Sequence, residues 1–487
     1  MKKAVMTTIL ALCAASAFAT IRAVSHDMYG GNANSWQLRR HAEKMSVVTN
    51  GGAKVVFIGD SITHFWESHG KAQLEKYFAE GDMKMLDLGV SADRTEHVLW
   101  RLNEGGELDG YEAKCILLMI GTNNTGHFPI EKEPPGDTIL GIREILRTIR
   151  AKQPKAMVVL TAIFPRSGAS ADRDRVRNDI VNKEIQKFAD GKNIFWCDFN
   201  DQFLTATGVL SPEIFPDRLH PNARGYEIWY SAVKPYIDSA LSDGKLPPPA
   251  NRYASRVNEK VYRFWENDAV FPESRIRNEG YGAEDWWLDR LLAKRNQIAD
   301  SNGEFDIVFF GDSITHNWES NGKQSLDELG KTYSILDIGY SGDRTQHLIW
   351  RGEYGGELDG YKAKCFMLMI GTNNSRSNAA EDTAKGVKKI LELIAKKQPQ
   401  AKTLLLPIFP RGDAKDGNRA KNAKVNEIIK GYADGEKVIW VDFNSKFLDE
   451  NGDTKWIMPD RLHPNAQGYT EIWMPAVLPH FKEICGK

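Results

Sequence analysis

Two triplets of the sequence, Gly59-Asp60-Ser61 and Gly311-Asp312-Ser313, place a serine directly after an apolar run. A serine hydroxyl can act as a nucleophile when a neighbouring base removes its proton. A helix pattern follows each triplet, so the serine can instead cap that helix. The unpaired amides of a helix N-terminus would also favour developing negative charge. The triplets alone leave both interpretations open.

A base for each serine is suggested by the octapeptide PDRLHPNA, which occurs twice. It contains Asp217 and His220 in the first half of the chain, and Asp460 and His463 in the second. With this spacing the carboxylate can accept a hydrogen bond from one ring nitrogen while the other faces a serine. An Asp-His pair that only holds a proline-bounded turn is the alternative. Two other histidines of the first half, His64 and His97, have matches in the second half. His64 could line the pocket mouth, and we expect His97 to be a packed or a surface residue.

Acyl transfer also needs hydrogen-bond donors for an oxyanion. Two kinds of matched segment offer them: small-residue turns at 89–93 and 339–343, and Gly-Thr-Asn-Asn at 121–124 and 371–374. The turns can present backbone amides, and the asparagines can present side-chain amides, although asparagine often only satisfies a turn. Ser91 is a rival nucleophile, as is its match in the second half, but its turn lacks the G-x-S-x-G pattern of an exposed serine.

These residues recur because the chain contains a long internal repeat. Residues 55–66 and 307–318 are identical at nine of twelve positions, 86–101 and 336–351 at ten of sixteen, and 105–125 and 355–375 at seventeen of twenty-one. The offset of about 250 residues is far too long for a solenoid unit. We infer a tandem duplication of one domain.

Each copy alternates short apolar runs with helical patterns, which predicts a parallel sheet covered by helices on both faces. In the first copy we expect strands near 54–58, 85–88, 116–120, 157–163 and 194–198, and a helix at 138–151. Ligands of such folds bind beyond the carboxyl ends of the strands. The candidate residues all follow strands, so they should meet at one edge.

The predicted domain boundaries follow from an apolar segment at the N-terminus and a proline-rich segment near the middle of the chain. Lys2 and Lys3 precede an apolar run that ends in Ala17-Phe18-Ala19, a pattern typical of a secretory signal peptide. The segment Ser242–Pro249 is small, polar and rich in proline, as expected of a spacer. We therefore predict a signal peptide at 1–19, a first domain at 20–241, a linker and leader segment at 242–284, and a second domain at 285–487. The mature protein should be secreted or periplasmic. We call 20–241 the first copy and 285–487 the second copy.

The overall composition excludes several classes of protein. The chain has 487 residues, of which 41% are hydrophobic, and a formal net charge of −1. This near-neutral charge gives no global attraction to nucleic acid or to anionic lipid, and no run after the leader is long enough to span a membrane. The remaining cysteines are sparse and lack metal-ligand spacing, so we expect buried free thiols and no metal site: Cys115, Cys197, Cys365 and Cys485.

The order of these signals, Gly-Asp-Ser, a small-residue turn, Gly-Thr-Asn-Asn and Asp-x-x-His, resembles the SGNH or GDSL-type hydrolases. The form LGxSxDRTxHxxWR looks most like the catalytic-subunit branch of platelet-activating factor acetylhydrolase. The resemblance covers nearly all of both copies. It implies two tandem flavodoxin-like three-layer α/β/α domains, each with about five parallel strands, that hydrolyse small acyl esters without a cofactor. Carried over by motif, it implies Ser-His-Asp sets and oxyanion donors at these positions: Ser61, His220, Asp217, Ala92 and Asn123 in the first copy, and Ser313, His463, Asp460, Gly342 and Asn373 in the second.

One position departs from the family pattern, because Ala92 stands where the family usually has glycine. If the turn requires a positive φ, alanine costs about 1 kcal/mol there and can displace the amide. A misplaced donor can cost about 10²–10³ in rate. The second copy, which has Gly342, should therefore be the more active one.

For function, we expect a serine esterase that acts on short acyl esters, with O-acetyl groups of carbohydrate as the first choice of substrate. Trp66, Trp100, Trp318 and Trp350 could form platforms for sugars, although buried tryptophan is the commoner case. The runner-up is a short-acyl phospholipid acylhydrolase. A carbohydrate-binding protein with decayed sites belongs to another class, but both copies keep every candidate residue. The two domains could also dock as an intramolecular pseudo-dimer.

Overall fold

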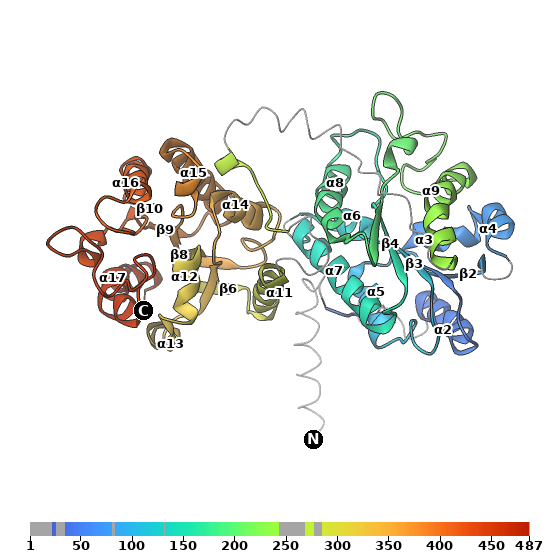
Figure 1. Ribbon diagram of the computed structural model, residues 1–487, viewed down its shortest axis with the longest axis horizontal. Helices are drawn as coiled ribbons and strands as arrows, with labels where there is room; N and C mark the ends of the chain where they lie inside the picture. The colour runs from blue at the N-terminus through green and yellow to red at the C-terminus, as the bar shows by residue number, and fades with distance from the viewer. Residues whose placement is uncertain are drawn as a thin grey trace, which may run out of the picture. The chain divides into compact units, whose positions relative to one another are not determined.

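Each half of the chain forms a five-stranded parallel sheet in the computed structural model (Figure 1). The structure describes residues 22–25, 35–79, 83–130, 132–242, 268–276 and 285–486. The predicted signal peptide and most of the predicted linker lie outside the described residues. The chain divides into two compact units, 1–262 with 276–288 and 263–275 with 289–487.

The first sheet has the strand order β2-β1-β3-β4-β5, which is the flavodoxin-like order. Its strands are β1 (Val55–Gly59), β2 (Met85–Gly89), β3 (Cys115–Met119), β4 (Met157–Thr161) and β5 (Ile194–Cys197). The helices of this half are α2 (Trp36–Thr49), α3 (Ser61–His64), α4 (Lys71–Tyr77), α5 (Thr95–Asn103), α6 (Thr122–His127), α7 (Pro135–Lys152), α8 (Arg173–Ile185) and α9 (Ala223–Leu241). Each expected strand is present within two residues of its expected bounds, and α7 contains the expected helix.

The second sheet repeats this order as β7-β6-β8-β9-β10. Its strands are β6 (Glu304–Gly311), β7 (Ile335–Gly339), β8 (Lys362–Met369), β9 (Lys402–Leu405) and β10 (Val438–Trp440). The helices are α11 (Asp285–Asp300), α12 (Ser313–His316), α13 (Lys323–Gly330), α14 (Thr345–Glu353), α15 (Ala380–Lys397), α16 (Gly417–Lys430) and α17 (Met474–Cys485), with a π-helical segment at Gly468–Trp473. The predicted fold class is confirmed in both halves.

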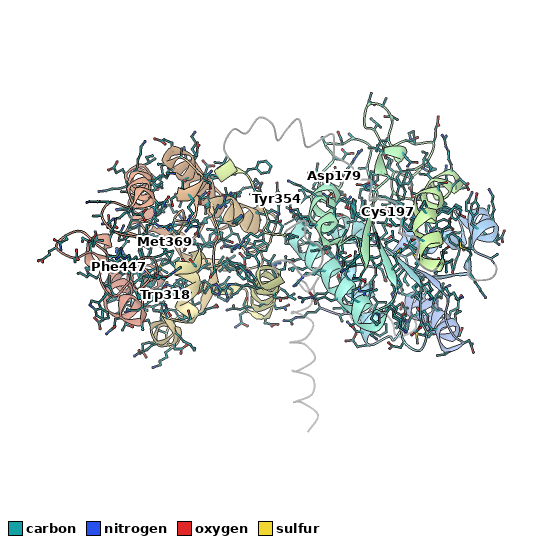
Figure 2. All side chains as sticks on the ribbon, viewed as in Figure 1. Asp179, Cys197, Trp318, Tyr354, Met369 and Phe447 are labelled. Carbon is teal, nitrogen blue, oxygen red and sulfur yellow. The ribbon has the colours of Figure 1, made fainter. Side chains whose placement is uncertain are left out.

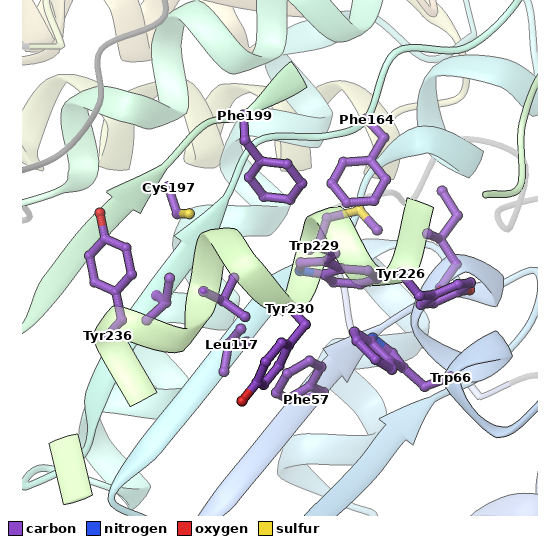
Figure 3. Packing of buried hydrophobic residues seen from close by; sticks show 14 of the residues in the cluster. Phe57, Trp66, Leu117, Phe164, Cys197, Phe199, Tyr226, Trp229, Tyr230 and Tyr236 are labelled. Atoms are coloured by element: carbon purple, nitrogen blue, oxygen red, sulfur yellow. The ribbon is translucent and has the colours of Figure 1, made fainter. Parts of the chain in front are cut away.

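Helices cover both faces of each sheet. In the first half α9 and α4 lie on one face, and α5, α7 and α8 lie on the other (Figure 1). Between the sheet and α9 lies an aromatic core in which the Trp66 ring is 4.8 Å from that of Tyr226 and 5.4 Å from that of Trp229 (Figure 3). The second half has a matching core, which includes the labelled residues Trp318, Met369 and Phe447 (Figure 2).

The strand register brings the ends of the central strands to one level. Gly59 at the end of β1 pairs with Gly89 of β2 on one side and with Met119 of β3 on the other. Gly311 of β6 pairs in the same way with Gly339 and Met369. The segments that follow these strands therefore emerge together at the carboxyl edge of each sheet.

The four cysteines outside the predicted signal peptide are buried free thiols, as expected. Burial raises the pKa of Cys197 to about 12. A thiol of this kind carries almost no thiolate at neutral pH and is therefore a poor nucleophile.

Candidate active site

Asp60, and not Ser61, caps the helix that follows β1. Its carboxylate oxygen Oδ1 accepts a hydrogen bond from the backbone amide of Ile62 at 3.0 Å, and Asp312 accepts one from Ile314 at the same distance. The aspartate before each serine thus accepts the capping hydrogen bond that the serine side chain could have accepted. The alternative that Ser61 only caps a helix does not agree with this geometry.

The helix that begins at Ser61 is shorter than its sequence pattern suggests. α3 has four residues, Ser61–His64, and passes directly into a 3₁₀ turn at Phe65–Glu67. One turn has almost no macrodipole, so the contribution that sequence analysis assigned to the helix dipole is small. As the first residue of α3, Ser61 still has a backbone amide without an intrahelical acceptor.

In the first copy, a serine, a histidine and an aspartate form a chain of hydrogen bonds. Ser61 Oγ lies 2.9 Å from His220 Nε2, and His220 Nδ1 lies 2.6 Å from Asp217 Oδ2. The other oxygen of Asp217 accepts hydrogen bonds from the backbone amides of Leu219 and His220. The loop therefore fixes the carboxylate, and the carboxylate fixes the imidazole.

The second copy repeats this arrangement. Ser313 Oγ lies 2.8 Å from His463 Nε2, and His463 Nδ1 lies 2.6 Å from Asp460 Oδ2. A serine and a histidine that lie 159 positions apart in the first copy and 150 in the second are thus in contact, as the sequence pattern required. A serine hydroxyl next to an imidazole that an acid orients is the arrangement used for nucleophilic acyl transfer.

Both aspartates are held as carboxylates. Partial burial alone would raise the pKa of Asp217, but hydrogen bonds from the backbone and ring of His220 outweigh it and leave the pKa below its usual range. The same opposing effects, with His463 as the donor, lower the pKa of Asp460. An ionised carboxylate keeps the proton of the imidazole on Nδ1, which leaves Nε2 free to accept the serine proton.

The turn after the second strand brings a backbone amide to the same edge. In the first copy the Asp93 amide donates to Val90 O at 3.1 Å and closes a turn in which Ala92 has a φ of 69°. Asn123 lies in α6, just after the third strand, and its Nδ2 donates to Asp93 O at 2.8 Å. This hydrogen bond fixes the asparagine to the turn. The Ala92 amide makes no hydrogen bond within the part of the chain that the structure describes.

The corresponding turn of the second copy has Gly342 with a φ of 80° and an Asp343 amide that donates to Tyr340 O. Asn373 Nδ2 donates to Asp343 O at 2.9 Å. A glycine at the end of the preceding strand permits the close approach of turn and serine, since a Cβ on Gly339 would lie 2.4 Å from the His316 amide. The four candidate oxyanion residues therefore lie in two equivalent pairs.

A comparison with protein families places both copies in one family. The model of the GDSL-like lipase/acylhydrolase family matches residues 57–228 and 309–470. The chain belongs to this family. It is accordingly a carboxylic ester hydrolase with two copies of the family domain.

Individual relatives agree with this assignment. The chain is 35% identical over 191 residues to platelet-activating factor acetylhydrolase IB subunit alpha2 of Homo sapiens, a match that covers 38% of this chain and 82% of the relative. It is 35% identical over 178 residues to subunit alpha1 of Rattus norvegicus, covering 36% of this chain and 75% of the relative.

Solved structures similar to this GDSL-type hydrolase include a GDSL-like lipase from Bacteroides thetaiotaomicron, with 17% identity, a TM-score of 0.34, and coverage of 40% of this chain and 97% of that one. Another is Axe2, an acetylxylan esterase from Geobacillus stearothermophilus, with 20% identity, a TM-score of 0.32, and coverage of 38% and 94%.

The rival serine of this GDSL-type hydrolase has a partner that sequence analysis missed. His64 Nδ1 lies 2.9 Å from Ser91 Oγ, and His316 Nδ1 lies 3.0 Å from Ser341 Oγ. Burial, reinforced by the charge of Arg40, lowers the pKa of His64 to about 4. So weak a base is poorly suited to activate Ser91. His97, by contrast, is packed as expected and accepts a hydrogen bond from the Arg94 amide.

An arginine from the helix before each sheet also holds the site. Arg40 Nε of α2 donates to Gly89 O at 2.6 Å, and Arg290 Nε of α11 donates to Gly339 O at 2.7 Å. Each bond fixes the end of the strand that leads into the turn with Ala92 or Gly342. Sequence analysis missed both arginines, although they lie 250 positions apart, at the offset of the repeat.

Three of the four matched tryptophans are core residues, the commoner case, and do not form sugar platforms. Trp66, Trp318 and Trp350 are at most 1% exposed, because they fill the cores between sheet and helices. Trp100 packs edge-on against His41. An exposed indole does lie near the first site, since Trp36 stacks on His64 with ring centroids 5.9 Å apart.

None of the helices in the described part of the chain has the length and apolar character that a membrane crossing requires.

Proposed function

We propose that each copy hydrolyses short-chain acyl esters through its serine, histidine and aspartate. The observation that carries this proposal is the unbroken contact from serine to histidine to aspartate, which occurs in both copies with distances of 2.6–2.9 Å. The proposed catalytic residues are Ser61, His220 and Asp217 in the first copy and Ser313, His463 and Asp460 in the second.

The reaction proceeds in two steps, described here for the first copy. His220 Nε2 takes the proton of Ser61 as Oγ bonds to the ester carbonyl carbon, and the carbonyl electron pair moves to its oxygen. The amides of Ser61 and Ala92 and the side chain of Asn123 stabilise this oxyanion. The intermediate collapses, and the leaving alkoxide takes the proton from His220. Water then loses a proton to His220 as it attacks the acyl-enzyme. When this second intermediate collapses, the bond to Ser61 Oγ breaks, Oγ takes the proton back from His220, and the carboxylic acid is released.

As substrates we propose O-acetyl groups on carbohydrate. The exposed indole of Trp36 supports this choice, because flat apolar rings suit the faces of sugar rings. A row of ring contacts leads from Trp36 to the base: Trp36 to His64 at 5.9 Å, His64 to Phe65 at 5.8 Å, and Phe65 to His220 at 4.9 Å between centroids. Export to the periplasm or the medium, which we propose from the predicted signal peptide, would bring the enzyme to extracellular polysaccharide.

A second candidate is hydrolysis of a short acyl chain from a phospholipid of the platelet-activating factor type. The 35% identity to the acetylhydrolase subunits supports it. Both candidates require the same active serines and differ only in the alcohol that leaves. Their discrimination therefore rests on substrates and not on site residues.

Labelling with a fluorophosphonate, followed by peptide mapping, tests the chemistry. Modification of Ser61 and Ser313 in the wild-type chain, with no labelling of His220→Ala or His463→Ala at the corresponding serine, supports two active sites. Absence of label at both serines would indicate a binding protein with decayed sites. Acetylated xylan, acetylated pectin and an acetyl-phospholipid, assayed side by side, then separate the two substrate classes.

A further inference from the structure

A short segment before the second sheet lies against the turn of that copy that contains the proposed oxyanion donor Gly342. We call this turn, residues 340–343, the oxyanion turn. We call residues 268–276 the leader segment. Ala269 is buried, and its carbonyl accepts a hydrogen bond from Thr345 Oγ1 at 2.8 Å. Four residues on, the amide of Glu273 donates to Gln346 O at 3.2 Å. These two bonds attach the leader segment to the N-terminal turn of α14 and bring Arg275 beside residues 341–343.

Arg275 binds the central peptide of the oxyanion turn. Its Nη1 donates to Ser341 O at 2.5 Å and lies 3.7 Å from Asp343 Oδ1. The carbonyl of Ser341 and the amide of Gly342 belong to one planar trans peptide and point in opposite directions. A group that fixes this carbonyl therefore fixes the direction of the Gly342 N–H as well.

From this contact we propose that Arg275 is a positioning residue that orients and polarises the oxyanion donor of the second copy. The central peptide of a turn with positive φ at its third residue can flip at modest cost, because types I and II differ mainly in its orientation. The hydrogen bond from Arg275 opposes such a flip. Its positive charge also draws electron density toward the Ser341 oxygen, which makes the Gly342 amide a stronger donor. The inference rests on the esterase function proposed above.

The same contact bears on the residue at the third position of the turn. A Cβ on Gly342 would lie 2.9 Å from Arg275 Nη1, so the guanidinium would have to shift to admit a side chain. In the first copy Val24 N donates to Glu96 O as Glu273 N donates to Gln346 O. This register makes His26, which lies outside the described residues, the counterpart of Arg275 by sequence. Alanine thus occurs in the copy without the arginine, and glycine occurs in the copy that has it.

The test uses the full-length chain with Ser61→Ala, so that only the second copy reacts. Into this parent we would introduce Arg275→Gln, Arg275→Lys and, as a matched control on the same segment, Glu273→Gln. We expect Arg275→Gln to lower kcat about tenfold, less than full loss of an oxyanion donor, with KM changed less than twofold. Inhibition by an alkyl boronic acid, which binds as a tetrahedral adduct, should weaken by the same factor. Arg275→Lys should restore part of the rate, and Glu273→Gln should leave it unchanged.

Equal kcat in Arg275→Gln and its parent would overturn the inference. An equal loss from Arg275→Gln in the Ser313→Ala chain, where only the first copy reacts, would also overturn it, because the effect would then be general. If the parent hydrolyses no ester but Ser313 reacts with a fluorophosphonate, the labelling rate replaces kcat and only the substrate proposal fails. If neither reaction occurs, the proposed function is wrong and this inference falls with it.

A double-mutant cycle gives an independent reading. Gly342→Ala should be costly in the parent, because the new methyl group meets the guanidinium. In the Arg275→Ala background the same substitution should cost several-fold less, since the space is open. Additive effects of the two substitutions on kcat would contradict the contact between Arg275 and the turn.

Discussion

Ala92 and Gly342 occupy the same position of the two oxyanion turns, with φ angles of 69° and 80°. Glycine adopts such angles freely, whereas alanine pays about 1 kcal/mol. The first copy therefore holds the proposed oxyanion donor, the Ala92 amide, in a strained turn, whereas the Gly342 turn of the second copy is unstrained. The structure thus supplies the positive φ on which the expected difference between the copies depends.

The two single serine variants should divide the activity unequally. We expect Ser313→Ala to remove most of the esterase activity and Ser61→Ala to remove the smaller part, because the donor geometry of the second copy is unstrained. The measurement is kcat/KM with an aryl acetate for both variants and for the double variant, which should be inactive. A larger loss from Ser61→Ala contradicts the prediction.

Relief of the strain should improve the first copy. Ala92→Gly, introduced into the Ser313→Ala chain, should raise kcat and stabilise the first domain by up to about 1 kcal/mol. Urea unfolding and steady-state kinetics measure the two effects. Ala171→Gly, at an alanine whose own φ is not positive, is the control and should bring neither gain. No change in kcat would mean that the alanine amide is already well placed.

The aspartates should act by orientation and charge, and not by taking up a proton. Asp217→Asn in the Ser313→Ala chain, and Asp460→Asn in the Ser61→Ala chain, should each lower kcat by about 10³–10⁴ with little change in KM. Because hydrogen bonds hold both aspartate pKa values below the usual range, the acid limb of the kcat/KM profile should contain no step that comes from Asp217 or Asp460. A step in the acid limb that disappears on Asp217→Asn or Asp460→Asn would argue against ionised carboxylates.

The half-buried His64 and His316 should make stability depend on pH. Burial, followed by the charges of Arg40 and Arg290, lowers both pKa values from 6.5 to about 4. As pH falls, the unfolded chain takes up protons first, so the contribution of the neutral rings is complete above pH 6.5 and is lost toward pH 4. His64→Gln with His316→Gln should therefore reduce the fall of the urea midpoint between pH 6.5 and 4.5. An unchanged fall would assign the pH dependence to other groups.

The exposed indole near the first site should matter for large substrates only. In the Ser313→Ala chain, Trp36→Ala should raise KM for acetylated polysaccharide severalfold and leave KM for an aryl acetate unchanged. Val209→Ala, at an equally exposed apolar side chain, is the control. An equal rise with both substrates would mean that Trp36 supports the site structurally and does not bind sugar.

Sequence analysis was reliable where the signal is local or repeated. The bounds of β1 and α7 follow from apolar periodicity, since burial on both faces of the sheet leaves runs such as VVFI without alternation. The approach of Ser61 to His220 agrees with the expectation that the segments after parallel strands emerge at one edge of the sheet. The repeat then supplied each inference twice.

Other features depend on partners that no local pattern reveals. Trp66 is buried because Tyr226 and Trp229 of α9 meet it in the core, more than 150 residues away. The pairing of His64 with Ser91 depends on how closely β2 approaches α3. The stretch that contains Arg275 has no counterpart in the repeated sequence blocks of the first copy. Its contact with Ser341 could therefore be found only in the folded chain.

Asp60 caps the N-terminus of α3, so the hydroxyl of the neighbouring Ser61 is not needed for a hydrogen bond to the backbone. Replacement of that hydroxyl by hydrogen should therefore leave the local conformation intact while it abolishes attack. Crystals of the doubly substituted, inactive chain could then be soaked with intact esters, and the alcohol portion of the bound ester would be seen directly in each half.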